Sequence, residues 1–264
     1  MELFDKQEEN NEYGNFLGFV LLDKPEWNKE KFIADFKNDW GIDIAEDIEE
    51  NSDPELYDST IVADIGEMLL TVSFMPAPIP NGEAEHYAAA NYLLKDAVEV
   101  TKTHTAQILV TVLGTKEDAI EKSKLYVKAA ASCLKQETAI GVYSNGAVYQ
   151  PEYFINFSGM IKDGDTPIFN LIWFGFYKGE EKSGFYTYGL KKFGKHEIEI
   201  YVDNNNADLN QIHNFIAVVA SYIINCDATL NDGETIGFTP EQQLPITYSD
   251  GIALDGKTLK IKYM

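Results

Sequence analysis

The segment Asp208-Leu-Asn-Gln-Ile-His-Asn-Phe-Ile-Ala-Val-Val-Ala-Ser-Tyr-Ile223 decides the fold of the C-terminal half. Its large apolar residues recur at spacings of three and four, which is typical of an amphipathic α-helix. Asp208 and Gln211 stand where the N-cap and N3 residues of a capping box belong. The segment therefore predicts one long helix with an apolar face formed by Leu209, Ile212, Ile216, Val219 and Ile223.

Aromatic-rich strands precede this helix. Residues 168–177, 184–190 and 195–202 are separated by Gly-containing turns, which predicts an antiparallel meander. Short strands at 235–238, 244–248 and 259–263 follow the helix, and Pro245 favours an edge position for the middle one. The pattern predicts a C-terminal α+β half, residues 163–264, which begins near Asp163-Gly164-Asp165.

The N-terminal half, residues 1–162, has a different order of elements. Its apolar patterns predict β-α-β-β-α-β-α-β, and one helix is expected from Glu83 to about His104. This order favours α+β architecture with mixed or antiparallel sheets, helices packed on one face, and a ferredoxin-like, split βαβ arrangement with additions. The length of 264 residues allows two domains or a single globular unit.

Acidic residues outnumber basic ones 43 to 21, which gives a net charge of −22. Nucleic acids and anionic membranes require basic surfaces, so neither is an expected partner. Many of the acidic residues lie in the first 58 residues and include Glu46, Asp47, Glu49, Glu50, Asp53 and Glu55. This run is typical of a solvated loop. The alternative is an acidic docking surface for a basic protein partner.

Two features bear on the cellular compartment. Residues Met1 to Asp5 lack the basic and apolar regions of a secretory signal, and no stretch approaches about 18 consecutive apolar residues. We therefore expect a cytoplasmic protein. Cys133 and Cys226 lie in helix-like apolar patterns, which predicts buried thiols.

One segment matches a catalytic motif, because Gly251-Ile-Ala-Leu-Asp-Gly-Lys-Thr258 fits the P-loop pattern. A P-loop needs a following helix whose N-terminus binds phosphate. Only the strand-like residues 259–264 follow here, so the context predicts a hairpin turn at Asp255-Gly256.

The histidines supply the candidate catalytic residues. His86 lies one helical turn after Glu83, and His104 lies between a predicted helix and a predicted strand. Glu83, His86 and His104 could act as acid, base or ligand at the Pro-rich end of a strand. One Glu-x-x-His pair does not make a metal site, so we expect neither a metal nor another cofactor.

Tyr186 and Tyr188 are candidates for a ligand groove, since aromatic rings with polar tips often line such sites. The alternative is that these alternating aromatics only mark one face of a strand.

Several stretches together resemble a known family. They are Leu69-Leu-Thr-Val-Ser-Phe-Met-Pro-Ala-Pro-Ile-Pro80 with Glu83-Ala-Glu85 and His104, and then Tyr186-Thr-Tyr-Gly-Leu190, Phe193-Gly-Lys195, Glu197-Ile-Glu199 and Asp232-Gly-Glu-Thr-Ile-Gly237. From about residue 60 to the C-terminus the chain resembles the bacterial domain-of-unknown-function family 4261. The resemblance implies a bacterial cytoplasmic protein and assigns no activity, cofactor or catalytic residue.

Two functional hypotheses follow from these observations. The first is a non-catalytic binding or protein-interaction module with an acidic surface. The second is an enzyme or small-molecule-binding protein that uses Glu83, His86 or His104.

Overall fold

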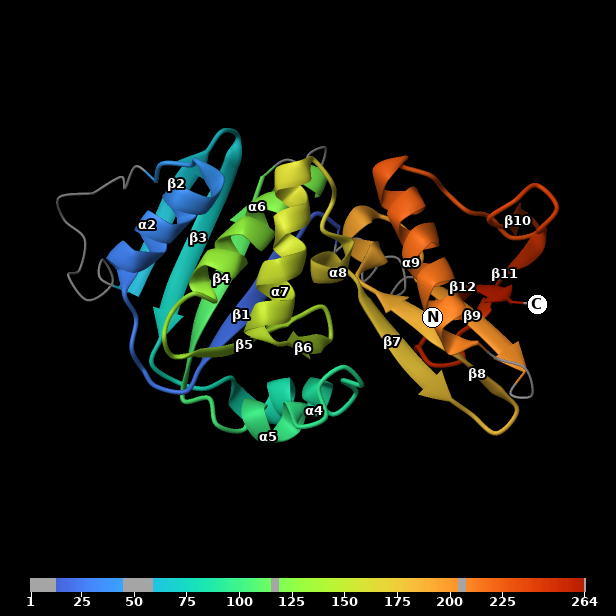
Figure 1. Ribbon diagram of the computed structural model, residues 1–264, viewed down its shortest axis with the longest axis horizontal. Helices are drawn as coiled ribbons and strands as arrows, with labels where there is room; N and C mark the ends of the chain where they lie inside the picture. The colour runs from blue at the N-terminus through green and yellow to red at the C-terminus, as the bar shows by residue number, and fades with distance from the viewer. Residues whose placement is uncertain (1–12, 45–58, 115–118, 204–207, 264) are drawn as a thin grey trace, which may run out of the picture. The chain divides into compact units, whose positions relative to one another are not determined.

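A computed structural model describes residues 13–44, 59–114, 119–203 and 208–263. The chain divides into two compact units, Met1–Leu171 and Ile172–Met264 (Figure 1). Each unit is α+β, as the sequence predicts. That the two halves are independent domains with a boundary near residue 163 stays a prediction.

The first unit contains a six-stranded antiparallel sheet with the order β2-β3-β4-β1-β5-β6. Its strands are β1 (Phe16–Leu22), β2 (Thr60–Ile65), β3 (Met68–Met75), β4 (Ala106–Leu113), β5 (Ala139–Ser144) and β6 (Ala147–Tyr149). β4 lies between β1 and β3 and runs antiparallel to both. The ferredoxin-like detail stays a prediction.

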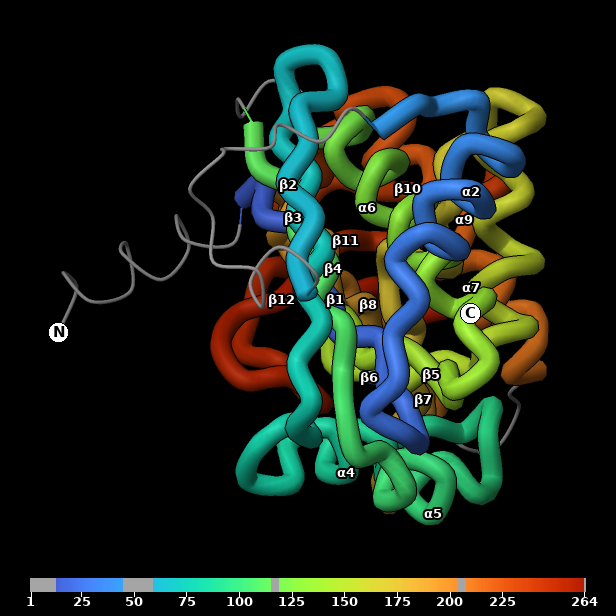
Figure 2. Tube along the Cα trace, turned by 90° about the vertical axis from the view of Figure 1, so that its left-hand side faces the viewer, coloured from blue at the N-terminus to red at the C-terminus, as the bar shows by residue number. Residues whose placement is uncertain are grey.

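Among the described residues of this unit, the longer helices are α2 (Lys29–Trp40), α6 (Ala119–Cys133) and α7 (Pro151–Ser158). Tyr126 of α6 lies against Gly18 and Ser144, whose positions share one face of the sheet. α2 packs beside α6, and the Trp40 indole N–H donates to the Lys128 carbonyl at 3.1 Å. Figure 2 shows both helices on the same side of β3 and β4. α7 and β6 are additional to the elements expected from the sequence.

The predicted helix from Glu83 to His104 is interrupted. It forms two short helices, α4 (Glu83–Ala88) and α5 (Ala97–Thr101), after a 3-10 turn at Pro80–Gly82. Between them, the Asn91 carboxamide oxygen accepts hydrogen bonds from the backbone N–H groups of Leu93 and Leu94. Because this side chain satisfies backbone donors outside a helix, it favours a turn over helix continuation.

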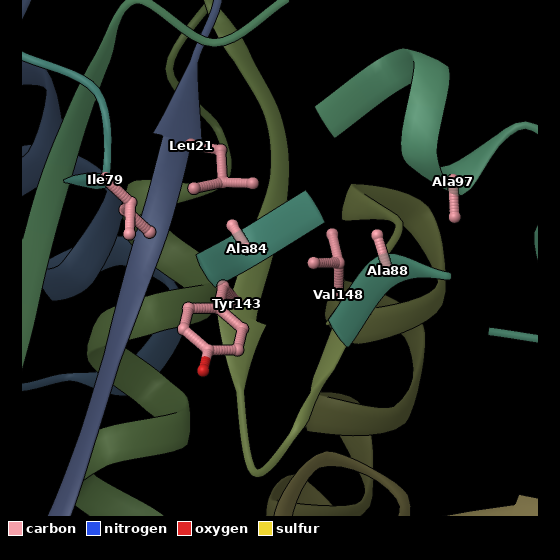
Figure 3. Close-up of a cluster of buried hydrophobic side chains, with 7 residues drawn as sticks. All are labelled: Leu21, Ile79, Ala84, Ala88, Ala97, Tyr143 and Val148. Carbon is pink, nitrogen blue, oxygen red and sulfur yellow. The ribbon is translucent and has the colours of Figure 1, made fainter. Parts of the chain in front are cut away.

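α4 contacts the opposite face of the same sheet. Ala84 and Ala88 pack in a buried cluster with Leu21, Tyr143 and Val148 (Figure 3). Leu21 alternates along β1 with Val20, which points toward the face covered by α6. The prediction of helices on one face therefore describes α2 and α6, but not α4. Within the described residues, this unit also contains a 3-10 helix at Gly159–Asp163 and α8 (Ile168–Leu171).

The second unit contains a mixed six-stranded sheet with the order β10-β11-β12-β9-β8-β7. Its strands are β7 (Trp173–Lys178), β8 (Lys182–Tyr188), β9 (Ile198–Asp203), β10 (Thr235–Ile236), β11 (Leu244–Asp250) and β12 (Lys257–Lys262). β7, β8 and β9 form the predicted antiparallel meander, and β12 pairs with β9 in parallel. β11 carries Pro245 but is not the edge strand, because the two-residue β10 pairs with it.

The long helix of the second unit is α9 (Leu209–Asn225), as its periodicity predicts. Asp208 is its N-cap and accepts hydrogen bonds from the backbone N–H groups of Asn210 and Gln211. A 3-10 turn at Leu190–Phe193 connects β8 toward β9. Cys226 follows α9 and is exposed, so the prediction of a buried thiol is wrong there; Cys133 is buried.

Some predictions lie outside the described residues, including those on Met1 to Asp5 and on the acidic run from Glu46 to Glu55. Among the helices in the described ranges, none combines the length and apolar character needed to cross a membrane.

Candidate functional site

Glu83 and His86 lie on the exposed side of α4. The Tyr143 hydroxyl donates to a Glu83 carboxylate oxygen at 2.8 Å, which connects α4 to β5. The His86 ring packs edge-on against Tyr87, with ring centroids 5.3 Å apart. The Glu83 hydrogen bond thus ties α4 to the sheet, whereas the His86 contact lies within α4 itself.

His104 is buried behind α4. Its Nε2 accepts a hydrogen bond from the Ile79 backbone N–H at 2.9 Å, and its Nδ1 lies 2.5 Å from the Thr101 carbonyl oxygen. Since a carbonyl can only accept, Nδ1 carries the proton and the ring is neutral. This histidine therefore connects the Pro-rich segment after β3 to the end of α5.

Glu85, and not His86, is the α4 side chain beside His104. A Glu85 carboxylate oxygen lies 3.8 Å from His104 Nδ1. Within the four described ranges, no group of three His, Cys, Asp or Glu side chains is arranged to hold a metal ion.

Tyr186 and Tyr188 lie on β8 in the second unit and, being two residues apart, point toward the same face of the sheet. The Tyr186 ring covers Gly175 of β7, where an added Cβ would lie 2.0 Å from the ring. Burial raises the pKa of the Tyr186 hydroxyl, and a hydrogen bond with Trp173 partly opposes this shift. Neither tyrosine lines a groove that this unit forms beside its long helix.

That groove lies beside α9 and has a volume of about 890 Å³. Phe215, Val218, Val219 and Tyr222 form its helical wall. The other wall is the segment 229–238, which leads into and past β10 (Figure 1). Val218, Tyr222 and Phe238 are 45%, 50% and 49% exposed, whereas Phe215 and Val219 are buried. The groove thus has a buried apolar floor and a partly exposed apolar rim.

Local contacts fix the wall that faces α9. The Phe238 ring packs edge-on against Phe215, with centroids 4.8 Å apart. The Phe238 backbone N–H donates to the side-chain oxygen of Gln242 at 2.8 Å. Gly237 is required in this turn, because an added Cβ would lie 1.8 Å from the Gln242 carbonyl oxygen. Phe238 is therefore held at the groove by its own turn.

The charged residues in and next to the wall segment 229–238 of the sequence are acidic. The chain contains no lysine or arginine between Lys195 and Lys257, but this stretch includes Asp232, Glu234 and Glu241. Glu234 lines the groove, and all three carboxylates lie in exposed residues. Lys195 reaches Thr229 at the groove, but its ammonium group is paired with Asp227 at 2.6 Å.

The P-loop-like segment binds a carboxylate of its own chain. Residues 251–256 connect β11 to β12, so the predicted hairpin is present, with a loop longer than two residues. Glu199 of β9 is fully buried. Its carboxylate accepts hydrogen bonds from the backbone N–H groups of Ile252, Ala253 and Leu254 at 2.7–3.1 Å. These amides are thereby satisfied without a phosphate.

A second buried carboxylate lies two residues earlier. Glu197 accepts hydrogen bonds from the Thr187 hydroxyl at 2.7 Å and from the backbone N–H groups of Gly189 and Lys191 at 2.8 and 3.3 Å. Burial nevertheless raises its pKa to about 7, because the loss of hydration outweighs these hydrogen bonds and the nearby Lys191 charge. Glu197 and Glu199 each fasten one loop to β9.

The groove could have been anticipated only in part from the sequence. Val218 and Tyr222 are large residues of α9 outside the predicted apolar face. A helix that is apolar beyond one face must bury the excess or expose a binding surface. The opposite wall, residues 229–238, has no regular periodicity that would place it beside α9.

Residues 186–262 match the sequence model of a family described as Domain of unknown function (DUF4261). The matched segment lies in the second unit and contains both walls of the groove. It is shorter than the resemblance expected from residue 60 onward. Comparison with curated proteins and with solved structures gives no match.

Proposed function

We propose that this protein is a non-catalytic binding module that docks a basic protein partner in the groove beside α9. The observation that carries the proposal is the combination of exposed apolar side chains, Val218, Tyr222 and Phe238, with acidic residues in and next to the wall segment 229–238, of which Glu234 lines the groove. Exposed apolar patches rimmed by polar residues are typical of interaction sites.

The negative charge of the chain favours a cationic partner and increases the rate of association. A field of net charge −22 accelerates the approach of a cationic partner, and Glu234 lies where such a partner would dock. Burial lowers the pKa of His213 on α9, so this ring adds no positive charge near neutral pH.

The contacts in the first unit favour binding over catalysis. Both ring nitrogens of His104 are engaged by backbone atoms, and a general base needs a free nitrogen within reach of its substrate. Glu83 is hydrogen-bonded to Tyr143. These interactions give His104 and Glu83 structural roles that require no catalytic activity.

The proposal is tested with a synthetic amphipathic peptide of leucine and lysine, about 14 residues long, and its counterpart with glutamate in place of lysine. Binding to the full chain is followed by isothermal titration at two salt concentrations. We expect the basic peptide to bind, and salt to weaken the binding. Equal binding of the acidic peptide would contradict the proposal.

Charge variants provide a matched control. The double variant Glu234→Gln, Glu241→Gln should weaken binding of the basic peptide by roughly 3–10-fold at low salt, because rim charges contribute modestly. Glu180→Gln, Glu181→Gln alters the turn between β7 and β8, which belongs to the opposite edge of the sheet from β10. This control should bind nearly as the unaltered chain does. Equal loss in both variants would overturn the assignment to the groove.

A further inference from the structure

We infer that the occupant of this groove is an amphipathic α-helix with a lysine- or arginine-rich outer face, lying along α9. The inference rests on the proposed function and specifies the partner of the same site. It follows from the shape of the two walls, from the short edge strand, and from the charge of the rim.

The helical wall has the spacing that a second helix would meet. Phe215, Val218, Val219 and Tyr222 are related as i, i+3, i+4 and i+7. They cover two helical turns, or about 10 Å along the axis. Such rows form the ridges and grooves into which side chains of a neighbouring helix pack. An incoming helix would place apolar residues at the same spacing against this wall.

The sheet edge offers much less to an extended peptide. β10 contains only Thr235 and Ile236, and the glycine turn at Gly237 ends it. Strand addition derives its affinity from a series of backbone hydrogen bonds along an edge. Two residues provide too short an edge for this, so the apolar groove favours a helix.

The groove also supplies preorganised aromatic contacts. Phe238 is fixed by its hydrogen bond to Gln242 and by Phe215, while half of its side chain stays exposed. Tyr222 lies in the helical wall and is equally exposed. Aromatic residues at the centre of an interface often supply much of its binding energy. A leucine or phenylalanine of the incoming helix would therefore insert between these two rings.

The charge of the rim selects a partner other than this chain. A second copy carries the same net charge of −22 and would be repelled. The first 58 residues of the chain are themselves strongly acidic, so they carry the same sign of charge as the rim and would also be repelled. A cationic helix from another protein complements Glu234 and its acidic neighbours.

The test compares two peptides of identical leucine and lysine composition. In one, leucines recur at i, i+3, i+4 and i+7; in the other, they alternate with lysine as in a strand. Each is titrated into the full chain, and circular dichroism measures the helix gained by the peptide. We expect the helical pattern to bind at least about tenfold more tightly and to gain helix on binding.

Two variants of α9 locate the interaction. Val218→Gln alters an exposed groove residue, and Leu209→Gln alters an apolar residue of the same helix that is 37% exposed and does not line the groove. Val218→Gln should weaken binding of the helical peptide roughly tenfold, and Leu209→Gln should leave it nearly unchanged. Unchanged thermal unfolding of both variants excludes a loss of fold as the cause.

The outcomes separate the two proposals. If both peptides bind equally and Val218→Gln weakens both, the helix inference is overturned while the proposed basic partner stands. If neither basic peptide binds at low salt, the proposed function fails and the helix inference fails with it. If the helical peptide binds but Val218→Gln has no effect, the assigned groove is wrong.

Discussion

Glu197 is a buried carboxylate whose neighbours only partly replace water. Three hydrogen-bond donors favour its ionised form, yet burial raises its pKa to about 7. The folded chain therefore keeps the proton between about pH 4.5 and 7, where the unfolded chain releases it. The contribution of Glu197 to the free energy of unfolding therefore falls as the pH rises through this window, because this group binds more protons in the folded state.

The first prediction concerns this pH dependence. The contribution from Glu197 is a loss of about 3 kcal/mol between pH 4.5 and 7, and Glu197→Gln removes it. Urea unfolding at pH 5 and pH 8 measures the effect. The variant should gain stability relative to the unaltered chain as the pH rises. A stability difference that is the same at both pH values would contradict the raised pKa.

The contacts of single buried residues are the features that the sequence predicts least well. Glu197 and Glu199 alternate with Ile198 and Ile200, which is typical of a strand with one solvated face. Both carboxylates are buried instead, since loops from other parts of the unit supply N–H donors to them. The partners of Glu199 lie 53–55 residues away and those of Glu197 lie 6–10 residues away in an irregular turn, so neither set leaves a periodic pattern. His104 is a similar case, because its backbone partner Ile79 lies 25 residues away.

Among the elements, α9 was predictable because its evidence is local. Apolar spacing and the Asp208 cap both act within a few residues; the helix and its cap are confirmed, but Leu209 of the predicted apolar face is exposed. The helix expected from Glu83 to His104 had similar apolar spacing. It is interrupted because the Asn91 side chain accepts hydrogen bonds from backbone N–H groups in a turn. The groove was predictable only in part, because the sequence predicts its α9 wall but not the position of residues 229–238.

A second prediction concerns the loop between β11 and β12. Glu199→Ala leaves the N–H groups of Ile252, Ala253 and Leu254 without their acceptor. We expect a loss of about 3 kcal/mol in unfolding free energy, measured with urea. Glu199→Gln keeps one acceptor oxygen and should lose less. An unchanged stability of the alanine variant would show that the loop does not depend on this carboxylate.

For the whole molecule, charge excludes more partners than it identifies. The excess of acidic residues was evident from composition, and it predicts a cationic partner. Composition alone does not locate the contact. The acidic run from Glu46 to Glu55 lies outside the described residues, whereas the groove beside α9 combines an acidic side chain, Glu234, with exposed apolar side chains.

The most direct measurement is hydrogen–deuterium exchange of the full chain with and without the basic helical peptide. Bound peptide should slow exchange of backbone amides in α9 and in residues 229–238, because it shields these walls and suppresses local opening. The β7–β8 turn provides the internal comparison and should be unaffected. Protection confined to residues 46–55, or to α4 and α5, would contradict the central claim that the groove is the binding site.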